Sequence, residues 1–152
     1  MTLTPAVALA LLAAGVFFSS GLLTGVWKYV KMNASPDATA PMYVDIAHRT
    51  SLMYSFASIL VAVFAFFSQH SDTINFYAVL ALVSFFALSI EMYLVHGWLN
   101  DTDNQLRRPH RLGKHTVPHK LITAFMWSLV AAEIGGFAVL LHGSWGVLWA
   151  AL

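Results

Sequence analysis

The sequence contains no cysteine and few charged residues. Of its 152 residues, 59% are hydrophobic and only 10% are charged, whereas soluble domains average about 25% charged residues. The absence of cysteine excludes disulfides, iron–sulfur clusters and thiolate-ligated zinc or haem. Any bound metal must therefore be ligated by histidine, carboxylate, methionine or tyrosine. The composition as a whole is typical of a protein that lies within a lipid bilayer.

Signature motifs of several enzyme classes are also missing. The sequence has no G-x-x-x-x-G-K-[ST], G-x-S-x-G or H-E-x-x-H pattern. These patterns build phosphate cradles, serine nucleophiles and zinc protease sites, respectively. The sequence therefore gives no support to phosphate cradling, serine hydrolysis or zinc protease chemistry.

Four long apolar runs are present instead, each longer than the roughly 20 helical residues that cross a hydrocarbon core. They cover residues 5–30, 44–68, 76–99 and 119–141. Because unpaired backbone groups are unfavourable in lipid, each run should be an α-helix, and short connections make successive helices antiparallel. We predict an all-α membrane protein with one domain over residues 1–152, an antiparallel four-helix bundle that forms oligomers. The aromatic stretch 143–149 is predicted as an interfacial anchor after the fourth helix.

The basic residues are confined to three places in the chain. They lie at the end of the first apolar run, at the start of the second, and between the third and the fourth: Lys28, Lys31, Arg49, Arg107, Arg108, Arg111, Lys114 and Lys120. In an antiparallel bundle these places share one face of the membrane. The positive-inside bias makes that face cytoplasmic, which predicts a bacterial-type inner membrane protein with both termini outside. Basic residues beside a membrane also favour anionic lipid over nucleic acid as a partner.

Two histidines lie near the basic ends of the predicted helices. His48 is close to the start of the second run and His96 is close to the end of the third, so their rings should lie at similar depth. A haem held by two histidines needs both rings to face one gap in the bundle. Alternatively, each ring is an interfacial group bonded to backbone or water. The periodicity of the sequence leaves both interpretations open.

Two acids and two tyrosines lie inside the apolar runs. Glu91 and Glu133 are unfavourable in lipid unless they face the bundle interior or a wet cavity. They lie about 12 and about 20 Å from the basic end, which makes a direct carboxylate pair unfavourable. Each is either a proton-relay or substrate-orienting group, or a protonated carboxyl bonded to a Ser or Tyr of a facing helix. Tyr54 and Tyr93 offer phenols to a pocket about two turns from the basic end, or else they anchor their helices.

Four short segments carry a resemblance to a known family. They are Gly25-Val26-Trp27, Ser35-Pro36, Ala47-His48 and Met92-Tyr93-Leu94. Their order, over roughly two thirds of the chain, resembles that in the styrene oxide isomerases, a family of small four-helix membrane proteins. Tyr93 matches the active-site tyrosine of the family by position. The family's asparagine six residues after the histidine is Tyr54 here, and its aspartate eight residues before the tyrosine is Phe85.

The resemblance implies a haem b near the cytoplasmic side of an oligomer, with a trimer as the expected assembly. His48 is the implied axial ligand, and Trp27, Arg49 and His96 are further candidate haem contacts. Ferric iron would act as a Lewis acid on a small hydrophobic substrate and open an epoxide toward a carbonyl product through a 1,2-hydride shift.

The same resemblance suggests which residues take part in catalysis. Tyr54 and Tyr93 are the candidate catalytic residues on the substrate side. Glu91 and His96 have no counterpart in the family, and Glu91 is expected to tune the pocket. Because Tyr54 and Phe85 differ from the family's residues, we expect a substrate, or a reaction, that differs from the family's. Haem binding is expected in either case.

Two other functions stay open. The first is a non-catalytic b-type haem protein that uses His48 and His96 together for electron transfer or sensing. The second is a small oligomeric transporter or accessory subunit without haem, in which Glu91 and Glu133 contact protons or a partner.

Overall fold

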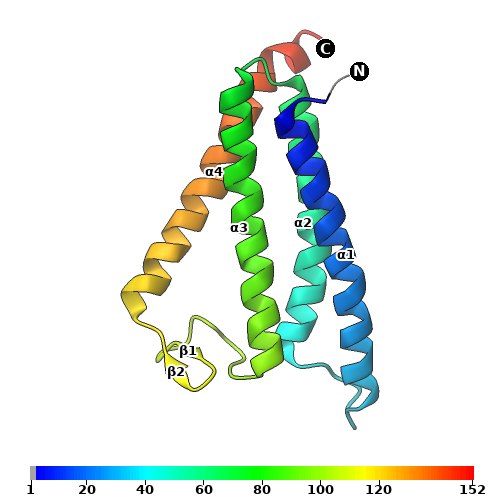
Figure 1. The fold of residues 1–152 in the computed structure, drawn as a ribbon, viewed down its shortest axis with the longest axis vertical. Coiled ribbons are helices and arrows are strands. Elements are labelled where there is room, and N and C mark those ends of the chain that lie inside the picture. Colours follow the sequence, from blue (N-terminus) through cyan, green and yellow to red (C-terminus); the bar gives the residue numbers. More distant parts are fainter. Residues whose placement is uncertain (1–2) are drawn as a thin grey trace.

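The computed structural model describes residues 3–152 and contains four long helices and one small hairpin. The elements are α1 (Pro5–Asn33), α2 (Met42–Phe67), α3 (Asp72–Leu99), β1 (Arg111–Leu112), β2 (His115–Thr116) and α4 (His119–Trp149). Successive helices run in opposite directions, as Figure 1 shows. All four are long and apolar enough to cross a membrane. The predicted all-helical fold, with four helices long and apolar enough to span a membrane, is therefore confirmed, and the hairpin is an addition to it.

The fourth helix is longer than its apolar run. It continues to Trp149, so the aromatic stretch 143–149 belongs to α4 and is not a separate segment after it. The reason lies in a tertiary contact. Gly143 is buried, and its carbonyl accepts a hydrogen bond from the Gln69 N–H at 2.9 Å. The connection between α2 and α3 thus packs on the part of α4 that follows the apolar run 119–141.

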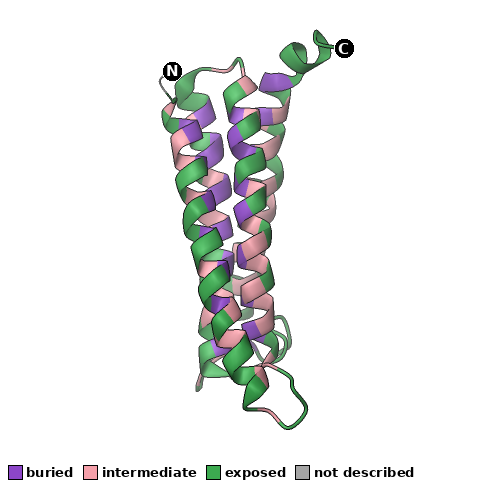
Figure 2. Cartoon of the chain, turned by 90° about the vertical axis from the view of Figure 1, so that its right-hand side faces the viewer, coloured by how far each residue is buried: buried purple, intermediate pink, exposed green. Residues whose placement is uncertain are grey.

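The buried core lies mainly between α1, α2 and α3. Figure 2 shows the buried residues as narrow stripes on the helices. Many of those in α1 and α2 are small: Ala6, Ala10, Ala14, Gly21, Ala47, Ser51, Ser55, Ser58, Ala62 and Ala65. Small residues let helices approach closely in lipid, where apolar side chains gain little by leaving the surrounding hydrocarbon. The first three helices therefore form the close-packed part of the bundle.

The fourth helix joins this core at one end only. Its buried residues, Gly136, Leu140, Gly143 and Ser144, all lie in its second half. In Figure 1, α4 converges with α3 beside the two termini and diverges from it toward the hairpin. Both the divergent end of α4 and the connection between α1 and α2 lie at the end of the bundle that carries the basic residues, called the basic end below.

The connection between α3 and α4 covers the divergent end of the bundle. It starts at Asn100, whose left-handed backbone (φ +46°) ends α3. The Asp101 carboxylate then accepts hydrogen bonds from His96 Nδ1, at 2.8 Å, and from the Gly113 N–H. Asp101 thereby joins the end of α3, the start of the connection and the turn of the hairpin into one unit.

The contact of α4 with α3 can be tested at two adjacent glycines. A Cβ at Gly136 would lie 3.0 Å from both the Ala78 carbonyl oxygen and Leu82 Cγ, whereas nothing lies within 4 Å of a Cβ at Gly135. We predict that Gly136→Leu lowers the free energy of unfolding by about 2 kcal/mol relative to Gly135→Leu, because a side chain must displace backbone at the first position alone. Unfolding by SDS titration in mixed micelles measures the difference. Equal stabilities of the two variants would contradict this packing.

Candidate functional site

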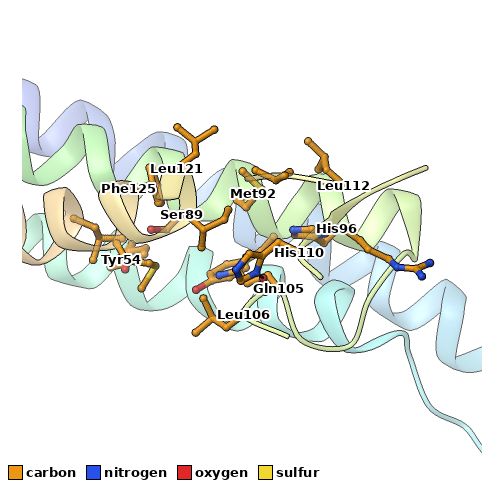
Figure 3. Close-up of a pocket in the computed structure, with 16 residues that line it drawn as sticks. Tyr54, Ser89, Met92, His96, Gln105, Leu106, His110, Leu112, Leu121 and Phe125 are labelled. Carbon is orange, nitrogen blue, oxygen red and sulfur yellow. Dashed lines mark hydrogen bonds between the residues drawn. The ribbon is translucent and has the colours of Figure 1, made fainter. Parts of the chain in front are cut away.

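A cavity of about 460 Å³ lies between α2, α3 and α4 at the basic end, where the connection 100–118 closes it. Its volume falls within the range of pockets that hold small molecules. In Figure 3, Tyr54 lies at one end of the cavity, and His96 and Leu112 lie at the other. The long direction of the cavity therefore runs from the interior of the bundle toward its basic end.

One face of α4 supplies much of the apolar wall. The residues concerned are Leu121, Ile122, Phe125, Met126 and Leu129. Their spacing places them on one side of a helix. Because α4 diverges from α3 here, these side chains face the cavity and do not fill the space as a core would. Met92 of α3 lines the same space from the opposite side.

Tyr54 joins the cavity to one of the two acids within the apolar runs. Its ring stacks on Phe86 of α3 with the ring centres 4.2 Å apart, and its hydroxyl donates to Glu133 Oε1 of α4 at 3.1 Å. A tyrosine on a facing helix is one of the two partners expected for a carboxyl group in lipid. Glu133 therefore holds the phenol at the inner end of the cavity.

Tyr93 lines the cavity closer to its basic end. Its ring stacks on Tyr43 of α2, with ring centres 5.9 Å apart. Tyr43 is buried and also packs against the ring of His96, with a separation of 5.0 Å between ring centres. The structure thus brings Tyr54 and Tyr93, the two tyrosines singled out in the sequence, into one cavity.

His96 lines the cavity and fixes the connection that closes it. The residue is 3% exposed, and its Nδ1 lies 2.8 Å from Asp101 Oδ1. Burial raises the pKa of Asp101, but the hydrogen bonds from His96 and the Gly113 N–H outweigh it, so the pKa lies below its usual value. The carboxylate is therefore ionised at neutral pH and acts as a fixed acceptor for both donors.

His48 lies outside this cavity, on the side of α2 that faces α1. Its Nδ1 is 2.8 Å from the Gly21 carbonyl oxygen, and its ring packs where a Cβ on Gly25 would be. A carbonyl oxygen accepts a hydrogen bond but cannot donate one, so Nδ1 carries a hydrogen, and in the neutral ring the lone pair is then on Nε2. This is the arrangement that orients a histidine for metal ligation through Nε2.

The two candidate haem histidines therefore belong to different helix contacts. His48 contacts α1, whereas His96 contacts Tyr43 and Asp101 and lines the cavity. Nothing in these contacts directs both rings into one gap. The contacts place His96, but not His48, beside the cavity.

The other candidate site residues lie apart from the cavity. Glu91 is exposed on α3 and does not line it. Trp27 packs against Gly97 of α3. A Cβ on that glycine would lie only 3.0 Å from Trp27 Cη2. Arg49 has a side chain that is 63% exposed, and it pairs with Asp45, which also pairs with Lys28 of α1. Arg49 and Asp45 lie within one helical turn of His48, and Lys28 lies within one turn of Gly25.

Several lining residues come from the connection between α3 and α4, and the sequence reasoning missed them. Gln105, His110 and Leu112 are examples. The available signal was the presence of apolar residues, such as Leu112 and Val117, inside an otherwise polar and basic segment. Such residues in a loop indicate a segment that packs on the protein and does not extend into water.

Comparisons with protein-family models, curated proteins and solved structures give no match for this chain. Among residues 3–152, no group of three or more His, Cys, Asp or Glu side chains could hold a metal ion. A haem differs from a bare ion in this respect, because the porphyrin supplies four ligands and the protein one or two.

The bond between α2 and α4 can be measured with a double-mutant cycle on Tyr54 and Glu133. We predict that Tyr54→Phe and Glu133→Leu are each destabilising and that their coupling energy is about 1 kcal/mol, the size of a hydrogen bond between membrane helices. Unfolding in mixed micelles supplies the four free energies. Additive effects of the two substitutions would show that the hydroxyl and the carboxyl do not interact.

The depressed pKa of Asp101 predicts how the stability depends on pH. A carboxylate with a lower pKa in the folded state stabilises the fold above its unfolded-state pKa, and this contribution disappears as the pH falls through the folded-state value. We therefore expect Asp101→Asn to lower the melting temperature at pH 6. The difference from wild type should shrink below about pH 4, the ordinary range of an aspartate. Melting curves of both proteins from pH 6 to pH 3 test this, and a constant difference would contradict it.

Proposed function

We propose that this protein is a membrane enzyme that acts on a small, mainly apolar molecule, and that it uses haem b held by His48. The observation that carries the proposal is the apolar cavity between α2, α3 and α4, which Tyr54 and Tyr93 line. Pockets with apolar walls and a few convergent polar groups are the usual binding sites of small molecules. The resemblance to styrene oxide isomerases supports the reaction class, conversion of an epoxide to a carbonyl compound.

The residues around His48 fit one axial histidine of a haem. The hydrogen bond to the Gly21 carbonyl fixes the ring and leaves Nε2 available as a ligand, and Gly25 lets the ring pack closely against α1. Lys28 and Arg49 supply positive charge near this histidine, which suits the carboxylates of a haem. The chemistry that haem b supplies when bound is Lewis-acid polarisation of an epoxide oxygen.

The remaining steps depend on the cavity residues. Apolar side chains of α3 and α4 exclude water, which prevents hydrolysis of a reactive substrate. The Tyr93 hydroxyl is placed to donate a hydrogen bond to a substrate oxygen, and the ring stacking on Tyr43 holds it in position. Tyr54, bound to Glu133, closes the inner end of the cavity.

The positions of His48 and the cavity suggest an oligomer. His48 faces α1, whereas Tyr54 on the same helix faces α3 and α4. A site that uses both groups is therefore completed by a second copy of the chain. The exposed apolar surface along the first half of α4 is available for such a contact, which supports a homo-oligomer. The trimer is implied by the resemblance alone.

The orientation in the membrane follows from charge. The basic residues near the ends of α1 and α3 and the start of α2 lie at one end of the bundle, and the termini lie at the other. The positive-inside bias then places the basic end, with the connection that closes the cavity, on the cytoplasmic side of a bacterial-type inner membrane.

Haem binding is the first test of this proposal. We predict that protein expressed with ample haem and purified in detergent shows the absorption of haem b, close to one per chain by pyridine haemochrome assay. His48→Ala should lose the haem, because it removes the ligand. The control His115→Ala removes an exposed histidine of the hairpin and should retain it.

Three other outcomes would contradict parts of the proposal. Colourless wild-type protein, or full haem retention in His48→Ala, would remove the haem from the mechanism. A low-spin six-coordinate spectrum that is lost in His96→Ala would instead favour a non-catalytic haem protein with two histidine ligands.

A further inference from the structure

Gln105 is fixed in the wall of the cavity by its backbone. Its N–H donates a hydrogen bond to the Tyr43 hydroxyl, and its carbonyl oxygen accepts one from His110 Nδ1 at 3.1 Å. Both partners are buried, at 5% exposure each. The two bonds attach this residue to α2 on one side and to the connection 100–118 on the other. Gln105 is therefore held in place before any ligand arrives.

The side chain of Gln105 contains a polar atom that lacks a hydrogen-bond partner. Its Oε1 atom is buried and has no hydrogen bond partner within residues 3–152, although the residue lines the cavity, where Figure 3 shows it close to His110. A buried amide oxygen without a partner is unfavourable, and native proteins contain few of them. The oxygen is also shielded from the cavity that the residue lines, so a rotation of the amide group is what presents it to a ligand that donates a hydrogen bond.

The surrounding side chains restrict the kind of donor. Ile122, Phe125, Met126 and Leu129 form an apolar wall, which suits an uncharged body. The cationic side chain that lines the cavity, Arg111, is exposed, so water already satisfies its charge. A hydroxyl also fits either orientation of the amide group, because it both donates and accepts.

We propose that the cavity binds a small apolar molecule that carries a hydroxyl group, an alcohol or a phenol, and that this hydroxyl donates to Gln105 Oε1. The apolar body lies along the Ile122–Leu129 face of α4 and extends toward Tyr54. This inference rests on the proposed use of the cavity as the substrate site. It adds that the substrate bears a hydroxyl at the end nearest the basic loop, apart from the group that reacts.

Three probes with the same 4-tert-butylphenyl body separate the contribution of the hydroxyl from that of the apolar body and from that of a negative charge. In 4-tert-butylphenol the hydroxyl can donate, in 4-tert-butyltoluene a methyl group replaces it, and 4-tert-butylbenzoate carries a negative charge. Their dissociation constants are measured by ligand-observed NMR with wild-type protein in nanodiscs. The variants are Gln105→Leu, the control Gln69→Leu, which alters the exposed glutamine between α2 and α3, and Met126→Trp, which fills the cavity.

The expected result is a selective loss in one variant. Gln105→Leu should weaken binding of the phenol roughly tenfold, the ratio for one hydrogen bond, and leave the toluene unchanged. Gln69→Leu should change neither probe, and Met126→Trp should abolish binding of both. Comparison of each probe between proteins cancels its partition into lipid.

The possible failures are distinguishable. If both neutral probes bind and Gln105→Leu changes them equally or not at all, the hydroxyl inference is wrong, while the cavity remains a substrate site. If the benzoate binds more tightly than the phenol, the ligand is an acid, and the same inference is overturned. If no probe binds to wild type, or if binding survives Met126→Trp, the cavity is not the site, and the proposed function fails with it.

Discussion

The carboxylate of Asp101 is the interaction on which the basic end of the molecule depends. It accepts hydrogen bonds from His96 at the end of α3 and from Gly113 in the turn of the hairpin, and the bonds of Gln105 to Tyr43 and of His110 to His119 fix the path of the connection between them. The path of the connection sets the positions of Gln105 and His110 in the cavity wall. A polar pair buried at 4% and 6% side-chain exposure is favourable only when both partners are present. The shape of the cavity therefore depends on a short polar unit outside the membrane-spanning core.

The fourth helix shows why such a connection is needed. In lipid, helices associate through close packing and interhelical hydrogen bonds, because apolar burial contributes little. α4 has close packing only in its second half, around Gly136 and Gly143. Along the rest of its length it is held by the Glu133 bond to Tyr54, by the contact of the Phe125 ring with Phe85 of α3 and, at its start, by the contact of His119 with His110 at 3.0 Å. A helix attached in this way can border a cavity without collapsing onto it.

The sequence predicts the helices of this protein better than it predicts their contacts. Length and hydropathy are sufficient to identify four spanning segments, because lipid permits few other backbone structures. Six residues separate His48 from Tyr54, which puts their side chains about 120° apart around a helix. The uniform hydropathy hides which face of each helix is buried, so it does not show which neighbouring helix each side chain meets. The pairing of Tyr54 with Glu133 joins residues 79 positions apart, and neither residue carries a local sign of the other. The hairpin is also hidden, because its two strands have two residues each.

The division of α2 into two faces limits what one copy of the chain can do. His48 is oriented by α1 and directs its free nitrogen away from the Gly21 carbonyl, whereas Tyr54 and Tyr93 share a cavity with α4. A rotation of α2 that brought His48 into the cavity would remove Tyr54 from it and break the close contact at Gly25. Tight packing of α1 against α2 forbids that rotation. If His48 and the tyrosines serve one reaction, they do so across a contact between copies, and the loosely packed α4 is the helix that such a contact can reposition.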